Sequence, residues 1–193
     1  MTLLRTGILV TVASLAFAGA AVPTLAQMQM SEQTVTVGGA PMYPSKNIIQ
    51  NAVNSKDHTT LVAAVKAAGL VETLEGPGPF TVFAPTNSAF AKLPPGTVES
   101  LLKPEMKAKL TGVLTYHVVP GRLSAKDLIE AAKKNGGTAE FKTVEGDTIS
   151  VESKGNNMLV IRDSKGNASK VTIQNVFQSN GVIHVIDSVL LPS

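Results

Sequence analysis

Three apolar segments, each ending in a turn, constrain the fold of this chain more than any other feature. They cover residues 80–90, 114–121 and 180–192. In each, a short apolar run meets a proline or glycine, which is typical of a buried strand that leads into a turn. The last segment is apolar on both of its alternating faces. We therefore predict that it is a central strand covered on both sides.

Residues 46–70 have the apolar spacing of two helices. The second of these has an apolar stripe that we interpret as core packing, and either Asp57 or Thr59 is expected to cap its start. Gly69 stands where a helix C-terminal stop is expected. This part of the chain therefore contributes helices, not strands.

The second half of the chain reads mainly as short strands joined by turns. One helix precedes them, and Ser124 and Asp127 are predicted to begin it with a capping box. The predicted strands of this half cover residues 139–144, 148–152, 158–161, 171–173 and 182–191. A helical first half and a hairpin-rich second half indicate an α+β domain, in contrast to an alternating parallel one.

The first residues are typical of an export signal. Arg5 supplies a positive start, residues 7–20 are apolar and small, and residues 24–26 fit a cleavage site. A membrane anchor is the alternative, but the run is short, because a span needs about 20 apolar residues. We predict a signal peptide over residues 1–26, and hence a periplasmic or extracellular location.

The rest of the chain is predicted to form one domain behind a short leader. Residues 27–44 are polar, with glycines and prolines, and are expected to be flexible, with a short strand over residues 34–37 as the alternative. Residues 45–192 hold all three apolar segments, show no internal repeat and are long enough to bury a real core. No later segment has the length and apolar character of a membrane span.

The composition argues against several classes of activity. The chain has no cysteine, so a disulfide scaffold and cysteine catalysis are excluded. The formal charge is +3 without a Lys/Arg cluster, and aromatic residues are few, so nucleic-acid binding is not expected. A nucleophile turn such as Gly-x-Ser-x-Gly and a glycine-rich phosphate loop are both missing from the sequence. We predict a non-catalytic protein without a cofactor.

The histidines and methionines do not form a metal motif. His58, His117 and His184 are single and far apart, whereas zinc sites usually show spaced pairs. A three-histidine site assembled in space is the alternative. A second alternative is soft copper(I) binding by the methionines near the start, which are Met28, Met30 and Met42. We expect these methionines to be incidental and predict no metal site.

Two pairs of polar residues lie inside the apolar segments. His184 and Asp187 are expected in a dry setting on the last strand, where each needs a hydrogen-bond partner. We interpret them as structural residues that bond loop backbone; a ligand or catalytic pair is the alternative. Tyr116 and His117 are placed on a strand over residues 116–119, where they would face opposite ways.

At these residues the chain resembles a known family. The run Thr-Val-Phe-Ala-Pro-Thr-Asn-x-Ala-Phe, which contains Thr86 and Asn87, is similar to the first signature of the fasciclin (FAS1) domain. Tyr116 and His117 stand where that family has a Tyr-His pair, and residues 180–192 resemble its second signature. The resemblance covers residues 44–192 and is greatest to small, single-domain bacterial secreted members.

The resemblance implies a fold and a general role. It implies an α+β wedge of two packed β-sheets with helices along one side, in which Thr86, Asn87, His184 and Asp187 are structural. In animal relatives the Tyr-His region and an Asp-Ile pair are linked to integrin contact. In this chain Asn175 and Val176 align with the Asp-Ile pair, so the carboxylate of that aspartate is missing. Integrin binding of that type is therefore not expected.

From the export signal and the resemblance we expect adhesion to a surface or matrix component, either protein or glycan. Tyr116 and His117 are the candidate residues for contact with this partner. The protein is expected to be a monomer or a weak homo-oligomer. The alternative is a periplasmic carrier of a small apolar ligand or a metal, using a cleft between helices and sheet.

Overall fold

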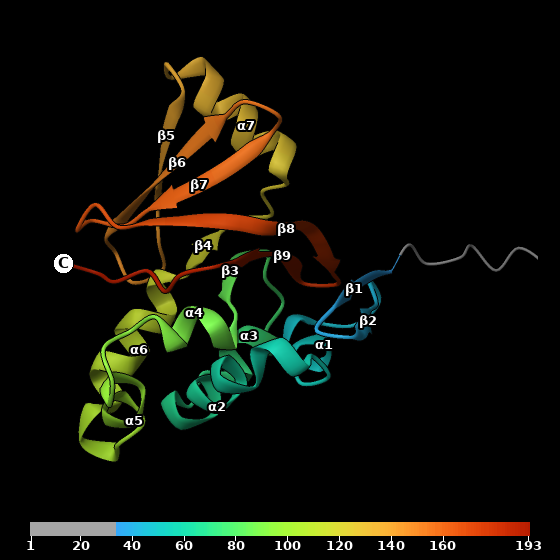
Figure 1. Cartoon of the computed structure of the whole chain (residues 1–193). Helices are drawn as coiled ribbons and strands as arrows, with labels where there is room; N and C mark the ends of the chain where they lie inside the picture. The colour runs from blue at the N-terminus through green and yellow to red at the C-terminus, as the bar shows by residue number, and fades with distance from the viewer. Residues whose placement is uncertain (1–33) are drawn as a thin grey trace, which may run out of the picture. The chain divides into compact units, whose positions relative to one another are not determined.

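Most helices lie in the first half of the described chain and most strands in the second half, as the sequence predicts, although a short strand hairpin precedes the first helix (Figure 1). The computed structural model describes residues 34–193. Its helices are α1 (Ile48–Ala52), α2 (Thr59–Ala68), α3 (Val71–Glu75), α4 (Asn87–Ala91), α5 (Thr97–Leu101), α6 (Lys107–Tyr116) and α7 (Ala125–Lys134), with 3-10 turns η2 (Lys56–His58) and η3 (Pro104–Met106). Its strands are β1 (Val35–Val37), β2 (Ala40–Met42), β3 (Phe80–Pro85), β4 (Val118–Pro120), β5 (Thr138–Lys142), β6 (Thr148–Lys154), β7 (Met158–Arg162), β8 (Ala168–Gln178) and β9 (Gly181–Ile186).

The strands form two sheets, and the α+β class is confirmed. One sheet is the hairpin β1–β2, and the other has seven strands in the order β4-β3-β9-β8-β7-β6-β5. Its neighbours are antiparallel except β3 and β9, which run parallel from the pair Phe80 and Gly181 to the pair Pro85 and Ile186. All six residues of β9 are buried, so the prediction of a central strand covered on both sides is confirmed.

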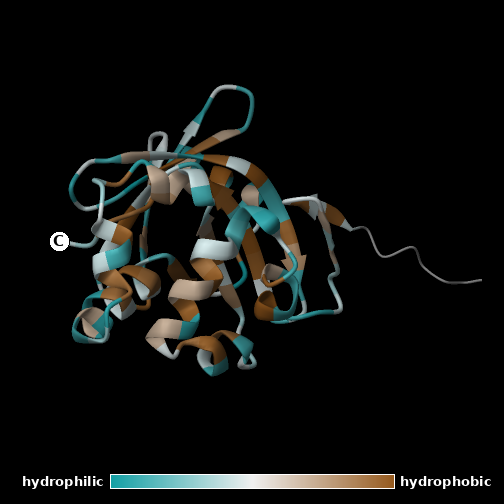
Figure 2. Ribbon diagram, turned by 60° about the horizontal axis from the view of Figure 1, so that its bottom comes forward, coloured by the Kyte–Doolittle hydropathy of each residue, from teal (hydrophilic) through white to brown (hydrophobic). Residues whose placement is uncertain are grey.

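Two hydrophobic cores lie on the two faces of β3 and β9. Val82 on β3 and Ile183 on β9 belong to the first core, together with residues of α1 to α6. Phe83 and Ile186 point to the second core, which α7 and strands β6 and β7 complete. Figure 2 shows hydrophobic residues along these strands and on the helices beside them. Alternation along a strand therefore supplies both cores at once.

Strand β8 is much longer than the predicted strand over residues 171–173. Its pairing with β9 shifts register between Val171 and Ile173, and again between Ile173 and Val176. Between these points Asn175 has a positive φ of 58°. Such bulges bend and twist a strand. They allow β5, β6 and β7 to share the second core with β3 and β9.

The flexible leader predicted over residues 27–44 is wrong for the part that the structure describes. Residues 34–44 contain β1 and β2, and both Val37 and Met42 are buried in the first core. Burial of apolar side chains stabilises a segment that its polar and glycine-rich composition leaves undefined. The predicted signal peptide over residues 1–26 lies outside the described residues.

The helix ends agree with the sequence in two places and differ in one. Gly69 adopts the left-handed conformation with φ 73° at the end of α2, and Ser124 and Asp127 form the capping box of α7. The start of α2 differs, because its N-cap residue is His58 and neither Asp57 nor Thr59 caps it. Over residues 34–193, no helix has the length and apolar character needed to cross a bilayer.

Candidate functional site

Asn87 joins two helices that are distant in sequence. Its Oδ1 accepts hydrogen bonds from the Thr60 amide at 3.0 Å and the Thr59 hydroxyl at 3.2 Å, and its Nδ2 donates to the Lys56 carbonyl at 2.8 Å. Helix α2 has no side-chain cap of its own, because His58 at the N-cap position makes no capping bond. Asn87 therefore supplies the cap from α4, whose own cap is Thr86.

Replacing Asn87 by alanine should lower the free energy of unfolding by about 0.5–2 kcal/mol, because it removes the cap from the part-buried Thr60 amide and the bond to the Lys56 carbonyl. Asn87→Asp keeps the acceptor at the start of α2 and should cost less. Ser88→Ala is the control, since Ser88 is exposed and lies beside Asn87 on the same helix. Denaturant unfolding measures the stabilities of the three variants and of wild type. If Asn87→Ala is as stable as wild type, Asn87 does not have this capping role.

Tyr116 ends helix α6 and is 0% exposed, so the strand predicted over residues 116–119 begins too early. Its hydroxyl donates to the Thr148 carbonyl and accepts from the Ser164 amide, both at 2.9 Å. Burial raises the pKa of this phenol. Tyr116 therefore joins α6 to the β6 strand and to the turn after β7.

His117 follows directly and is 2% exposed. Its Nδ1 donates to the Val113 carbonyl at 2.7 Å, and its Nε2 accepts from the Leu190 amide at 3.0 Å. Burial lowers its pKa to about 4. The ring is a neutral bridge between α6 and the chain after β9, because both of its nitrogens are occupied.

The predicted contact of Tyr116 and His117 with a partner stays a prediction, and the structure restricts its form. Both rings are covered, and their polar atoms bond backbone of the same chain. They can act on a partner only indirectly, by holding in place the chain that follows them, which runs through β4 to Arg122.

His184 is buried on β9 and holds that same stretch of chain. Its Nε2 donates to the Leu123 carbonyl at 2.9 Å, and its Nδ1 accepts from the Asn175 amide at 3.4 Å. The ring stacks on Phe83 with centroids 5.8 Å apart. Burial lowers the pKa of His184, so the imidazole is neutral. It ties the β8 bulge to the loop after β4.

Asp187 lies just past β9 and not in the dry setting predicted for it. Its side chain is 35% exposed and forms an ion pair with Lys92 at 3.4 Å. Its Oδ1 accepts from the Lys170 amide at 2.8 Å. Burial opposes ionisation, but the Lys170 amide and the Lys92 charge lower the pKa of this carboxyl below its usual value. Asp187 and His184 bond different partners and do not form a pair.

An exposed arginine and phenylalanine lie next to the loop that His184 holds. The guanidinium of Arg122 sits over the Phe177 ring, 5.3 Å from its centroid, and donates to the Gln178 carbonyl at 2.8 Å. Phe177 is 38% exposed on β8. On either side of Arg122, the buried Thr81 hydroxyl donates to the Gly121 carbonyl at 2.6 Å and accepts from the Leu123 amide at 2.9 Å. We call Arg122 and Phe177 the Arg–Phe pair.

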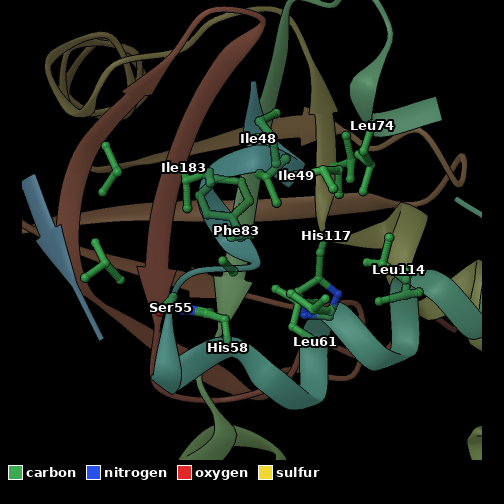
Figure 3. A pocket seen from close by; sticks show the side chains of 18 of the residues that line it. Ile48, Ile49, Ser55, His58, Leu61, Leu74, Phe83, Leu114, His117 and Ile183 are labelled. Atoms are coloured by element: carbon green, nitrogen blue, oxygen red, sulfur yellow. Dashed lines mark hydrogen bonds between the residues drawn. The ribbon is translucent and has the colours of Figure 1, made fainter. Parts of the chain in front are cut away.

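A cavity of about 50 Å³ lies in the first core between the helices and the sheet. Most of its wall is aliphatic and comes from α1, α2, α6, β3 and β9 (Figure 3). Ser55, His58 and His117 also line it. The Ser55 hydroxyl and the His58 Nδ1 are 2.8 Å apart, and their side chains lie together in Figure 3.

The described residues contain no group of three or more His, Asp or Glu that could hold a metal ion. Of the methionines considered for copper(I), Met42 is buried in the first core, and Met28 and Met30 lie outside the described residues. The absence of a metal site stays a prediction for the whole chain.

Sequence reasoning missed both the Arg–Phe pair and the role of His58. Arg122 and Phe177 are 55 positions apart and meet only because β8 and the loop after β4 lie together. Ser55 and His58 are three positions apart, and this spacing beside a predicted helix start is a signal that the sequence does offer.

The comparisons place the chain among known proteins. A sequence profile described as the Fasciclin domain matches residues 56–192. Protein sll1483 of Synechocystis sp. is 45% identical over 87% of this chain and 86% of that protein. Immunogenic protein MPB70 of Mycobacterium bovis is 38% identical over 73% of this chain and 66% of that protein. A FAS1 domain pair from the insect cell adhesion molecule fasciclin I has a TM-score of 0.69 at 20% identity, over 77% of this chain and 52% of that one.

Proposed function

Since the chain belongs to the fasciclin domain family, we propose that it is an exported, non-catalytic protein that binds a surface or matrix component. The partner is a protein or a glycan. The similar fold of a domain pair from a cell adhesion molecule supports an interaction role. The contacts of Asn87, His117 and His184 support a structural and not a catalytic use of the signature residues.

The Arg–Phe pair is the observation that carries this proposal. Arginine and aromatic residues are the types that dominate binding energy at protein interfaces. Here the arginine is oriented by its bond to the Gln178 carbonyl and by its contact with Phe177. Thr81 and His184 fix the loop on both sides of it. A surface that is already ordered loses little conformational entropy when a partner binds.

Replacing Arg122 and Phe177 together by alanine should weaken capture of the partner by at least about tenfold, because each is an anchor type whose loss typically costs more than 1 kcal/mol. The measurement is a pull-down with the mature protein from the host envelope and culture medium. Binding to the immobilised captured partner, after salt washes, then gives the affinity ratio.

Val144→Ala is the matched control, since Val144 is an exposed apolar residue just past β5. Thermal melting must show that both variants fold. Equal capture by wild type and the double variant would show that the binding surface lies elsewhere on the molecule. Failure of wild type to capture any partner would contradict the proposed interaction role.

A second candidate function is a carrier of a small apolar ligand, and the cavity in the first core favours it. The cavity lies between helices and sheet, where a ligand would be shielded from water. Native mass spectrometry of protein purified from its own host should then show added mass. A clean apo mass would count against carriage of a ligand in the host.

A further inference from the structure

A second and larger pocket opens to solvent beside α5 and α6. Its volume of about 410 Å³ lies within the range of about 300–1,000 Å³ that is typical of small-molecule sites. Its wall comes from the segment 95–106, which contains α5, from α6, from the turn between β7 and β8, and from the C-terminal segment. In Figure 1 the C-terminus lies on the same side of the molecule as α5 and α6. We call this the α5–α6 pocket.

Most of the wall of the α5–α6 pocket is apolar. Leu101 on α5 and Val113 on α6 are buried members of the first core, and both line the pocket. Met106 and Leu191 line it too and are only partly buried. The pocket therefore leaves an edge of the first core open to water. Covering such a surface favours an occupant with an apolar body.

Two lysines bring positive charge to the same pocket. Lys109 comes from α6 and Lys165 from the turn between β7 and β8, and both are exposed. Neither takes part in the ion pairs formed within residues 34–193. A lysine stem can lie along an apolar wall while its ammonium group stays in water. An anionic group at the mouth of the pocket would therefore meet two cations that no carboxylate of the described chain holds.

Asp163 holds two parts of the pocket wall together. It is 6% exposed, and its Oδ1 accepts from the Lys165 amide at 3.0 Å while its Oδ2 accepts from the Leu191 amide at 3.1 Å. The Asn167 amide and side chain donate to the same two oxygens, both at 2.8 Å. These N–H groups offset the charge of the carboxylate. The wall is thus ordered in the absence of a ligand, which limits the conformational entropy lost on binding.

The charges around the pocket favour a ligand with one negative charge. Glu99 on α5 and Glu105 in η3 lie on the same elements as the wall, although neither lines the pocket. Their carboxylates would repel a polyanion such as a nucleotide. Thr97 and Ser100 line the pocket and carry hydroxyl groups, which can donate to a carboxylate. Because exposed ion pairs contribute little, most of the affinity must come from the apolar body of the ligand.

We propose that the α5–α6 pocket binds an aliphatic monocarboxylate, with its chain on the apolar wall and its carboxylate at Lys109 and Lys165. The pocket shares no lining residue with the cavity in the first core. It also does not include the Arg–Phe pair. The inference therefore goes beyond both proposed functions and rests on neither.

The first test is an NMR titration of the methyl-labelled protein with octanoate and with octan-1-ol, which has the same chain and no charge. Octanoate should shift the methyl resonances of Leu101, Val113 and Leu191 and saturate them. Its affinity should be at least about threefold higher than that of octan-1-ol at low salt, as expected for two exposed ion pairs, and this preference should disappear at high salt. Hexanoate, which is two methylenes shorter, should bind about fourfold more weakly or less well still.

Three outcomes of this titration would overturn the proposal. The first is equal affinity for octanoate and octan-1-ol at low salt. The second is an equal shift of the exposed Val53 and Val144 methyl groups, which would show non-specific adsorption. The third is a shift confined to Val37 and Ile183, which would place the ligand in the cavity of the first core.

The second test uses variants at exposed positions, with circular dichroism to confirm that each folds. Lys109→Gln/Lys165→Gln removes both charges and should bind octanoate no more tightly than octan-1-ol. Lys133→Gln/Lys134→Gln at the end of α7 is the matched control, because it removes the same charge away from the pocket and should keep the preference. Ser100→Phe places a ring at the pocket and should weaken both probes. A preference for octanoate that survives in the Lys109/Lys165 variant, or is lost equally in the control, would overturn the role of these two lysines.

Discussion

Lowering the pH from about 7.5 to about 5 should remove about 2 kcal/mol of folding stability through His117 alone. The pKa of His117 is about 4 in the folded protein, against an ordinary value of 6.5. In the unfolded chain this residue therefore takes up a proton as the pH falls through 6.5, while the folded protein resists protonation. The unfolded state binds more protons in this window, so stability falls with falling pH.

The other buried histidines act in the same direction. Burial lowers the pKa values of His58 and His184 as well, so these residues add to the loss of folding stability as the pH falls. Carboxyl groups with lowered pKa values, such as Asp187, contribute chiefly below about pH 5, which is why the comparison stops there. The window from about 7.5 to about 5 therefore reports on histidine.

Chemical denaturation at several pH values measures this effect. The comparison is with His117→Gln, whose side chain stays neutral over the whole range. In this variant the free energy of unfolding should fall less steeply with falling pH, whatever its value at neutral pH. Circular dichroism at neutral pH confirms that the variant folds. Identical slopes for wild type and variant would show that His117 does not carry the predicted proton linkage.

Replacing Gly181 by alanine should lower the free energy of unfolding by about 3 kcal/mol or more, the upper part of the range for overpacking a core. Gly181 pairs with Phe80 in the parallel contact between β9 and β3. A Cβ at this position would overlap the Phe80 carbonyl oxygen, which is backbone and cannot turn away as a side chain would. The two central strands would have to separate.

Gly112→Ala provides the matched control for this prediction. Gly112 lies within α6, and a Cβ there has nothing within 4 Å. This alanine should stabilise the protein by up to about 1 kcal/mol, because glycine is a poor helix former. Urea unfolding of both variants measures the difference. An alanine at position 181 that melts like wild type would mean that the strands tolerate the added methyl group.

The sequence predicts those parts of the fold that depend on local patterns. The α+β class and the buried central strand follow from apolar alternation and turn residues, although this strand ends at Ile186 and not at residue 191. The family follows from the resemblance of the signature runs. Gly69 and Ser124 mark helix ends correctly. The sequence predicts a strand over residues 116–119, because an apolar run there leads into the turn residues Pro120 and Gly121. Helix α6 instead continues to Tyr116, since its hydroxyl and its ring are held by distant chain.

The candidate sites depend on contacts between distant residues, which local patterns do not contain. The cap of α2 comes from Asn87, and the partner of Arg122 is Phe177 on another strand. Sequence reasoning identified His184 as a buried group that needs partners, but only the fold shows that these are Leu123 in the loop after β4 and Asn175 at the β8 bulge.

The position of β9 also has a consequence for the order in which the molecule is assembled. The last strand in the chain is the one between β3 and β8, and its contacts with β3 join residues about a hundred positions apart. The helical half can therefore form local structure as it is synthesised, but neither core can close before β9 arrives. A nascent or truncated chain that lacks β9 would expose β3 and β8 along unpaired edges, and such edges favour aggregation.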